Sequence, residues 1–182
     1  YFQRRTAIIE RIVGASRPGQ ETETWTKQLI NSLTSALQAG DKPSGVRLNQ
    51  LLGSLKQKTP DSNLVAYAEY RQLFASYSSD IGQAANTEQQ QKIQTTWLTN
   101  LKTFVSKHPA SDDAPDAILQ LALNAEFAAN AADARAWYGQ LVSKHGQSPQ
   151  AVRAAGALQR MDLRGKALTL SGPDPAGRTI NV

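Results

Sequence analysis

The feature that most constrains the fold of this chain is a short stretch that occurs twice. Residues 104–108 read FVSKH and residues 141–145 read LVSKH, an offset of 37 residues. The same offset pairs Leu101 with Tyr138, Ser111 with Ser148, Ala114 with Ala151, Ala117 with Ala154, and Leu121 with Leu158. Periods of about 20–50 residues are typical of stacked helical hairpins, because one hairpin is too small to bury its own apolar face. The spacing therefore predicts stacked helix pairs over residues 93–161.

Each position of the repeat matches a structural role in a helical hairpin. Lys and His in the last turn of the first helix complement the negative end of that helix. Pro109 in one repeat, or Gly146 in the other, then ends the helix. Ser111 or Ser148 caps the helix that follows. The apolar stripes of the two first helices comprise Trp97, Leu101, Phe104 and Val105, and Ala134, Tyr138, Leu141 and Val142.

The pattern resembles the tetratricopeptide-like repeats of bacterial envelope proteins, and the resemblance covers residues 93–161. It departs from the standard repeat, whose period of about 34 residues and Trp-Leu-Gly-Tyr pattern are not found here. The peptide-holding residues of standard repeats therefore have no counterparts that can be carried over, and the partner-binding residues are unknown.

The sequence upstream of the repeats predicts further helices. Together with the repeats they imply an all-α fold of about eight helices, arranged as antiparallel hairpins in a right-handed stack. We expect Trp25, Trp97 and Tyr138 to be largely buried. The expected upstream helices are one that carries Ile8, Ile9, Ile12 and Val13 and ends near Gly14, one over residues 20–39, one over residues 43–58, and one that carries the stripe from Tyr67 to Ile81.

Helix ends are also marked in the sequence. Gly40 is expected to follow the last residue of the second helix in a left-handed conformation. The run Thr59-Pro60-Asp61-Ser62 breaks the chain and caps the fourth helix. Thr87 and Gln90 have the spacing of a capping box, which predicts the start of a fifth helix at this point.

The fourth helix carries Tyr67, Tyr70, Phe74, Tyr77 and Ile81 at steps of three and four residues. This spacing places the side chains on one seam of a helix. The seam has two interpretations, helix–helix packing and an aromatic-lined binding groove, of which we favour packing.

Composition excludes several classes of function. The chain has no cysteine, so it forms no disulfide, has no thiolate nucleophile and by itself carries out no thiol chemistry. Hydrophobic residues make up 40% of the 182 residues and charged residues 19%, which fits a soluble globular protein. No apolar run reaches the roughly 18–20 residues of a membrane span. No nucleotide-binding loop, nucleophile elbow or zinc motif is present, and we expect no cofactor.

The net charge of +5 raises the question of nucleic-acid binding. Arginines are mildly concentrated at the start of the chain, at Arg4, Arg5, Arg11 and Arg17. Nucleic-acid binders usually interleave such charges with aromatic residues on one face, whereas the aromatic residues here fall on apolar stripes. We therefore favour a solvated basic surface over a nucleic-acid site.

His108 and His145, the two histidines of the chain, occupy equivalent repeat positions. A metal site needs three or four convergent ligands, and no carboxylate lies at ligand spacing beside either residue. We interpret both as histidines at helix ends. Asp112, Asp113 and Asp116 lie together before a helix, and we interpret them as acids that favour the helix dipole rather than as a catalytic pair. No catalytic or metal-binding residue is therefore predicted.

The last twenty residues, LRGKALTLSGPDPAGRTINV, differ from the rest of the chain. They alternate apolar residues, at Leu168, Leu170, Ile180 and Val182, around a Gly/Pro/Asp turn, which predicts a β-hairpin. A lone hairpin is marginal in water unless another element covers it. The pattern resembles the junction in secreted bacterial thioredoxin-like proteins of the TlpA/redoxin family, on Leu163, Gly165, Lys166, Ala167, Leu168, Leu170, Gly172, the turn 174–178 and Ile180.

We divide the sequence into three segments. Residues 1–3, Tyr-Phe-Gln, match the end of a protease-cleavable tag and are set apart. Residues 4–162 form the helical repeat-like domain. Residues 163–182 correspond to the opening β-hairpin of a thioredoxin-like domain, which in the family precedes a segment with a CxxC pair.

The resemblance also implies a function and a location. We expect a non-catalytic helical module of an extracytoplasmic thiol–disulfide oxidoreductase, which positions the redox domain, dimerises or holds a protein partner. The alternative is a free-standing repeat-type adaptor that binds a protein or a peptide.

Overall fold

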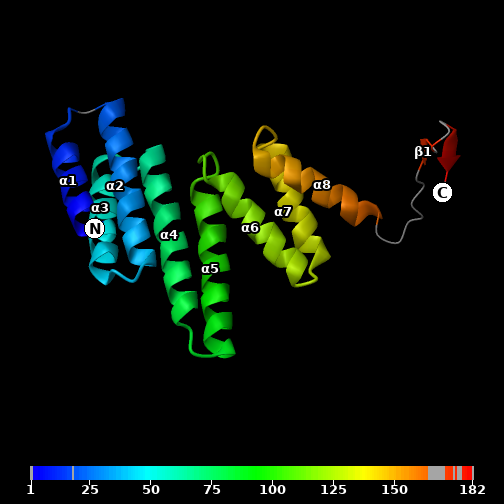
Figure 1. Ribbon diagram of the computed structural model, residues 1–182, viewed down its shortest axis with the longest axis horizontal. Helices are drawn as coiled ribbons and strands as arrows, with labels where there is room; N and C mark the ends of the chain where they lie inside the picture. The colour runs from blue at the N-terminus through cyan, green and yellow to red at the C-terminus, as the bar shows by residue number, and fades with distance from the viewer. Residues whose placement is uncertain (1, 18, 164–170, 174, 176–177, 182) are drawn as a thin grey trace. The chain divides into compact units, whose positions relative to one another are not determined.

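The computed structural model describes residues 2–17, 19–163, 171–173, 175 and 178–181. This part of the chain holds eight α-helices and one pair of short strands, so the predicted all-α class is confirmed (Figure 1). The elements are α1 (Phe2–Ala15), α2 (Gln20–Gln38), α3 (Lys42–Lys58), α4 (Asn63–Gln83), α5 (Thr87–Lys107), α6 (Ala114–Phe127), α7 (Ala131–Lys144), α8 (Pro149–Leu163), β1 (Ser171–Pro173) and β2 (Thr179–Asn181).

The chain divides into two compact units, Tyr1–Leu121 (unit 1) and Ala122–Val182 (unit 2). Their boundary lies inside α6, so unit 1 holds α1–α5 with the first half of α6. Phe2 and Gln3, which we set apart as a tag remnant, are the first residues of α1. The three predicted segments and the right-handed sense of the stack stay predictions.

The core of unit 1 forms around α2, which packs against α1, α3 and α4. The buried apolar residues that carry the stripes of these helices meet here, as their helical spacing predicts. In Figure 1 the antiparallel α4 and α5 continue the row. The core cluster comprises Ile9, Leu29, Ile30, Leu33, Leu48, Leu52, Val65 and Ala68.

Three large aromatic side chains were expected in the interior. Trp97, at 6% exposed, and Tyr138, at 1%, are buried, which confirms the prediction for these two residues. Trp25 is partly buried and packs against the core of unit 1, so it is less deeply buried than the other two residues. The reason is that α1 covers one flank of α2 and leaves Trp25 at the edge of an open groove.

Helix α2 ends as the sequence predicts. Gly40 has φ of 91°, in the left-handed region, and its N–H donates to the Leu37 carbonyl at 2.9 Å. The N–H of Asp41 donates to the Ala36 carbonyl at 2.9 Å. These two bonds form a Schellman motif, which satisfies carbonyls at the helix end.

The cap of α5 lies one residue earlier than predicted. Asn86, not Thr87, is the N-cap residue, and its side chain accepts from the Gln89 N–H at 2.9 Å. Gln89 reciprocates, because its Oε1 accepts from the Ala85 N–H at 2.8 Å. Asn is at least as effective an N-cap as Thr, and the same three-residue spacing occurs one step upstream. The predicted cap of α4 is confirmed, with Ser62 Oγ accepting from the Val65 N–H at 3.3 Å.

The two repeats have equivalent turns. In each, the N–H of the histidine donates to a carbonyl four residues earlier, at 2.8 Å for His108 and 2.9 Å for His145. The serine three residues later donates its N–H to the carbonyl of that histidine, at 3.1 Å and 2.8 Å. Ser148 Oγ caps α8 by accepting from the Ala151 N–H at 3.1 Å. The 37-residue period in the sequence therefore corresponds to two turns with the same pattern of backbone hydrogen bonds.

Strands β1 and β2 pair antiparallel, with Gly172 opposite Ile180. The predicted hairpin is therefore present, but its paired residues begin at Ser171. Leu168, Leu170 and Val182, on which part of the prediction was based, lie outside the described residues.

The end of α6 leads to a test of backbone strain. This helix ends in the same Schellman motif as α2, but the left-handed residue is Ala129, with φ of 57°. An alanine Cβ costs about 1 kcal/mol in this conformation. We expect Ala129→Gly to raise the free energy of unfolding by about 0.5–1 kcal/mol, and Gly40→Ala to lower it by about 1 kcal/mol.

Urea unfolding followed by far-ultraviolet circular dichroism measures both changes. Ala136→Gly, at an exposed position inside α7, is the control and should lose about 1 kcal/mol, because glycine there only weakens the helix. A loss of stability in Ala129→Gly would contradict the assigned strain.

Candidate functional site

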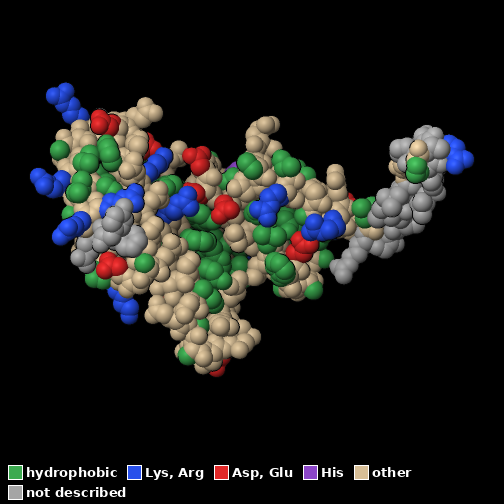
Figure 2. Space-filling view, in the orientation of Figure 1, with side chains coloured by type: hydrophobic (Ala, Val, Ile, Leu, Met, Phe, Trp, Pro, Cys, Tyr) green, Lys and Arg blue, Asp and Glu red, His purple; other side chains and the backbone are tan. Residues whose placement is uncertain are grey.

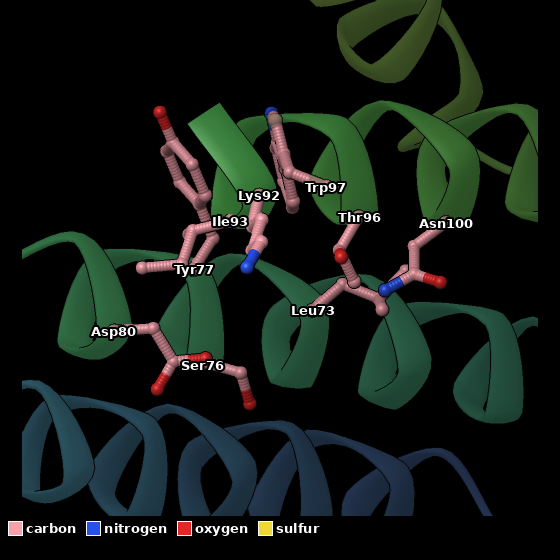
Figure 3. A pocket seen from close by; sticks show the side chains of 9 residues that line it. All are labelled: Leu73, Ser76, Tyr77, Asp80, Lys92, Ile93, Thr96, Trp97 and Asn100. Atoms are coloured by element: carbon pink, nitrogen blue, oxygen red, sulfur yellow. The ribbon is translucent and has the colours of Figure 1, made fainter. Parts of the chain in front are cut away.

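Helices α4 and α5 enclose a pocket of about 190 Å³ in unit 1 (Figure 3). This volume is below the roughly 300 Å³ typical of small-molecule sites, but it suits a single large side chain of a partner. The lining residues are Leu73, Ser76, Tyr77 and Asp80 of α4, and Lys92, Ile93, Thr96, Trp97 and Asn100 of α5.

Two aromatic rings form one wall of this pocket. Tyr77 of α4 stacks on Trp97 of α5 with ring centroids 4.7 Å apart and planes 19° apart. Phe74 contacts the same indole edge-on, with centroids 6.1 Å apart. Such ring pairs add about 0.5–1.5 kcal/mol to the free energy gained by burial. The contacts between the rings therefore help to hold Tyr77 and Trp97 in place in this wall.

The rim of the pocket is polar and carries both signs of charge. Asp80 lies on α4, and Lys92 lies on α5, where its ammonium is 2.9 Å from Glu88 (Figure 3). The Tyr77 hydroxyl donates to Gln94 Oε1 at 2.6 Å, which fixes the ring. The pocket can therefore hold an apolar or aromatic side chain while polar groups on the same partner meet the rim.

Along the aromatic seam of α4, one part packs against another helix and another part lines the pocket. Tyr70 is 2% exposed and packs on Phe104 of α5, with centroids 5.3 Å apart, as helix–helix packing predicts. Further along, Tyr77 lines the pocket and Phe74 is 39% exposed. Residues of α5, Trp97 among them, complete this wall. The spacing of residues within α4 does not predict which residues of α5 take part.

A charge cluster joins three helices on another side of α4. Glu69, 13% exposed, accepts from Lys56 of α3 at 2.7 Å and from Lys107 of α5 at 2.8 Å. His108 Nε2 lies against the other carboxylate oxygen of Glu69. The sequence has no carboxylate at ligand spacing beside His108. In the structure the carboxylate beside this histidine comes from Glu69 on α4, 39 residues before it. Local spacing carries no signal for such a contact.

The environment of Glu69 shifts its pKa. Burial raises the pKa, but the hydrogen bonds from Lys107, Lys56 and His108 outweigh burial and lower it to about 2. A carboxyl whose pKa falls on folding stabilises the protein above its unfolded pKa of about 4.5. This stability is lost as the pH falls towards 2.

His145 occupies the equivalent position in unit 2 but has a different environment. Its Nε2 is buried and has no hydrogen-bond partner among the described residues. Burial, and then the charge of Lys144, lower the pKa of this imidazole below 6.5. The two histidines are therefore both at helix ends, as predicted, but only His108 is paired with a carboxylate.

Two of the three aspartates near the start of α6 also connect helices, beyond the predicted effect on the helix dipole. The Tyr70 hydroxyl donates to Asp116 in the first turn of α6. Arg71 of α4 lies 3.3 Å from Asp113, whose pKa is raised by burial despite this neighbour. Asp112 is exposed. Asp113 and Asp116 are therefore placed to anchor α6 to α4.

Neither histidine belongs to a metal-binding group: across residues 2–17, 19–163 and the described part of the C-terminus, no three His, Asp or Glu side chains converge as a metal ion requires. No helix in the described part of the chain is both long and apolar enough to cross a membrane.

Comparisons of the chain with protein-family models, with curated proteins and with solved structures found no match. Inferences about function therefore depend on the chain's own geometry and on the resemblances described above.

The Glu69 cluster generates a test of stability. We expect Glu69→Gln to lower the free energy of unfolding by about 1–3 kcal/mol, because two lysines and His108 lose their carboxylate. The variant should also lose less stability than the wild type when the pH is lowered from about 4.5 towards 2.

Glu88→Gln is the matched control. Glu88 pairs with Lys92 across one turn of α5, and both side chains are 75% exposed. Removal of such a pair should change stability by less than about 0.5 kcal/mol. Equal effects of the two substitutions would show that the Glu69 cluster contributes no more than a surface pair.

His145 generates a test near neutral pH. Because its pKa is lower in the folded state, stability should be complete above pH 6.5 and should fall as the pH drops below that value. His145→Gln should reduce this loss, measured by urea unfolding from about pH 7.5 to 5. An unchanged pH profile would contradict the burial of the neutral imidazole.

Proposed function

We propose that this chain is a non-catalytic helical module of an extracytoplasmic thioredoxin-like protein of the TlpA/redoxin type. Its role is to position the redox domain and to hold a protein partner. The observation that supports the proposal is the antiparallel pairing of β1 with β2, which follow the helical repeats in the sequence, in the segment where the family has its opening hairpin.

The arrangement of the helices supports a role in interaction. The repeated turn geometry at His108 and His145 belongs to helical hairpins, which present extended surfaces to protein partners. The implied thiol–disulfide exchange needs a cysteine pair, and none of the 182 residues is cysteine. In this proposal the redox step therefore belongs to a separate segment of the parent protein.

Reading the parent gene past the codon for Val182 tests the proposal. We expect an open frame that encodes a thioredoxin-like segment with a CxxC pair within a few tens of codons. A stop codon at that point, or a continuation without such a pair, would contradict it. The extracytoplasmic location is tested by fusing the N-terminal part of the parent protein to a reporter that is active only outside the cytoplasm. An inactive reporter would contradict this location.

A free-standing adaptor is the second candidate, and the pocket between α4 and α5 favours it. A stacked Tyr77 and Trp97 with a polar rim is the kind of surface that holds one anchor side chain of a peptide. In this case Tyr77→Ala should abolish capture of the native partner, whereas Phe127→Ala, at an 88% exposed position in unit 2, should not. Equal capture by both variants would contradict a role for the pocket.

A further inference from the structure

A second hollow in unit 1 lies along the side of α1 and α2. It has a volume of about 630 Å³, more than three times that of the pocket between α4 and α5. Its walls are apolar: Ile8, Ile9 and Ile12 come from α1, and Trp25 comes from α2. Arg4 and Arg5 line it towards the N-terminal end of α1. We call this feature the α1–α2 groove.

The groove exists because α1 uses only part of its surface inside unit 1. Ile9 is 4% exposed and reaches the core, and Thr6 forms a hydrogen bond with Ser32 of α2 at 3.2 Å. Glu10 pairs with Arg47 of α3. These contacts fix α1 against α2 and α3, and they leave Ile8 59% exposed on the opposite flank. An exposed isoleucine beside a partly buried tryptophan forms an apolar patch that this unit does not cover.

The charged residues that line the groove, Arg4 and Arg5, are both positive. Arg4, Arg5 and Arg11 are exposed on α1, and none of them forms an ion pair within the described part of the chain. Glu10, the acidic residue of this helix, is already paired with Arg47. In Figure 2, Lys and Arg side chains project along the edge of unit 1 that α1 forms. The surface is therefore complementary to an apolar partner that carries acidic groups.

We infer that the α1–α2 groove binds an acidic amphipathic helix of a partner protein. The partner's apolar ridge, at positions i and i+4, would pack on Ile8, Ile12 and Trp25. Its Asp or Glu side chains would pair with Arg4 and Arg5. The groove residues on α1 run from Arg4 to Ile12, about 12 Å at 1.5 Å per residue, which matches roughly two turns of a helix. The inference depends on the proposed role of the chain as an interaction module.

The geometry disfavours the other occupants. A membrane is disfavoured because a planar bilayer can contact the exposed Ile8 but cannot reach the walls of a hollow between two helices. The ridge of side chains on a partner helix can fill such a hollow. A second copy packed by two-fold symmetry on this groove would bring its own unpaired Arg4 and Arg5 to a surface that already has an excess of positive charge. Nucleic acid would leave the apolar walls without a matching surface.

The test starts from a displayed library of helix-forming peptides in which Leu, Ala, Glu and Lys are randomised, selected on the full chain. We expect the enriched peptides to carry a Leu ridge with Glu beside it. Their binding, measured by fluorescence anisotropy, should weaken as salt is added. Trp25 gives a direct readout, because its emission should shift when a peptide covers it, and the shift should be absent in Trp25→Phe.

Matched variants locate the site. Ile8→Glu should weaken binding about tenfold or more, and so should Arg4→Glu combined with Arg5→Glu. Val46→Glu on α3 is the control for the first, because Val46 is 58% exposed and lies outside the groove. Lys102→Glu on α5 is the control for the charge reversals. Circular dichroism should show that all these variants stay folded.

Three results would overturn the inference. The first is that no peptide is enriched, or that the enriched peptides bind Ile8→Glu as well as the wild type. The second is binding of the chain to phosphatidylglycerol vesicles in a way that Ile8→Glu abolishes. The third is self-association that the same substitution abolishes. The parent gene tests the proposed thioredoxin-like function, and peptide binding tests the groove. A negative result in one experiment therefore does not affect the other.

Discussion

The structure of unit 1 depends on the burial of α4 and on partners for the polar groups that this burial encloses. Tyr67 donates to Asn31 of α2 at 2.7 Å, and Glu69 accepts from Lys56 of α3 and Lys107 of α5. Tyr70 donates to Asp116 of α6. A buried polar group without a partner costs about 1–3 kcal/mol, so the bonds of Glu69 and Tyr70 fix the positions of their neighbours, and the exposed bond of Tyr67 adds a contact to α2. One helix therefore sets the register of four others.

The periodicity of the chain predicted this framework well. Helices over residues 20–39 and 43–58, the Schellman end at Gly40 and the equivalent turns at His108 and His145 are present, because each depends on neighbours in the sequence. The start of α5 differs by one residue, since Asn86 and Gln89 offer the same capping chemistry as Thr87 and Gln90. Trp25 is less deeply buried than Trp97 and Tyr138, because its exposure depends on what covers α2 from outside.

The candidate site could be predicted only in part. The seam from Tyr67 to Ile81 indicated that aromatic side chains of α4 face another helix, and Tyr70 with Phe104 agrees with that. The pocket beside Tyr77 requires Trp97 and Lys92 from α5, and the environment of His108 requires Glu69 from α4. These pairings join residues about 15–40 positions apart, and the packing of whole helices decides them, not local spacing.

The low exposure of Glu69 has a consequence for how the stability of unit 1 responds to ionic strength. Mobile ions screen exposed pairs such as Glu88 with Lys92, because the Debye length shrinks from about 10 Å at 0.1 M salt to about 3 Å at 1 M. They reach the carboxylate of Glu69 much less, since it is 13% exposed and is held by three cationic or hydrogen-bonding groups. The junction of α3, α4 and α5 should therefore keep its stability at ionic strengths that weaken the exposed ion pairs around it.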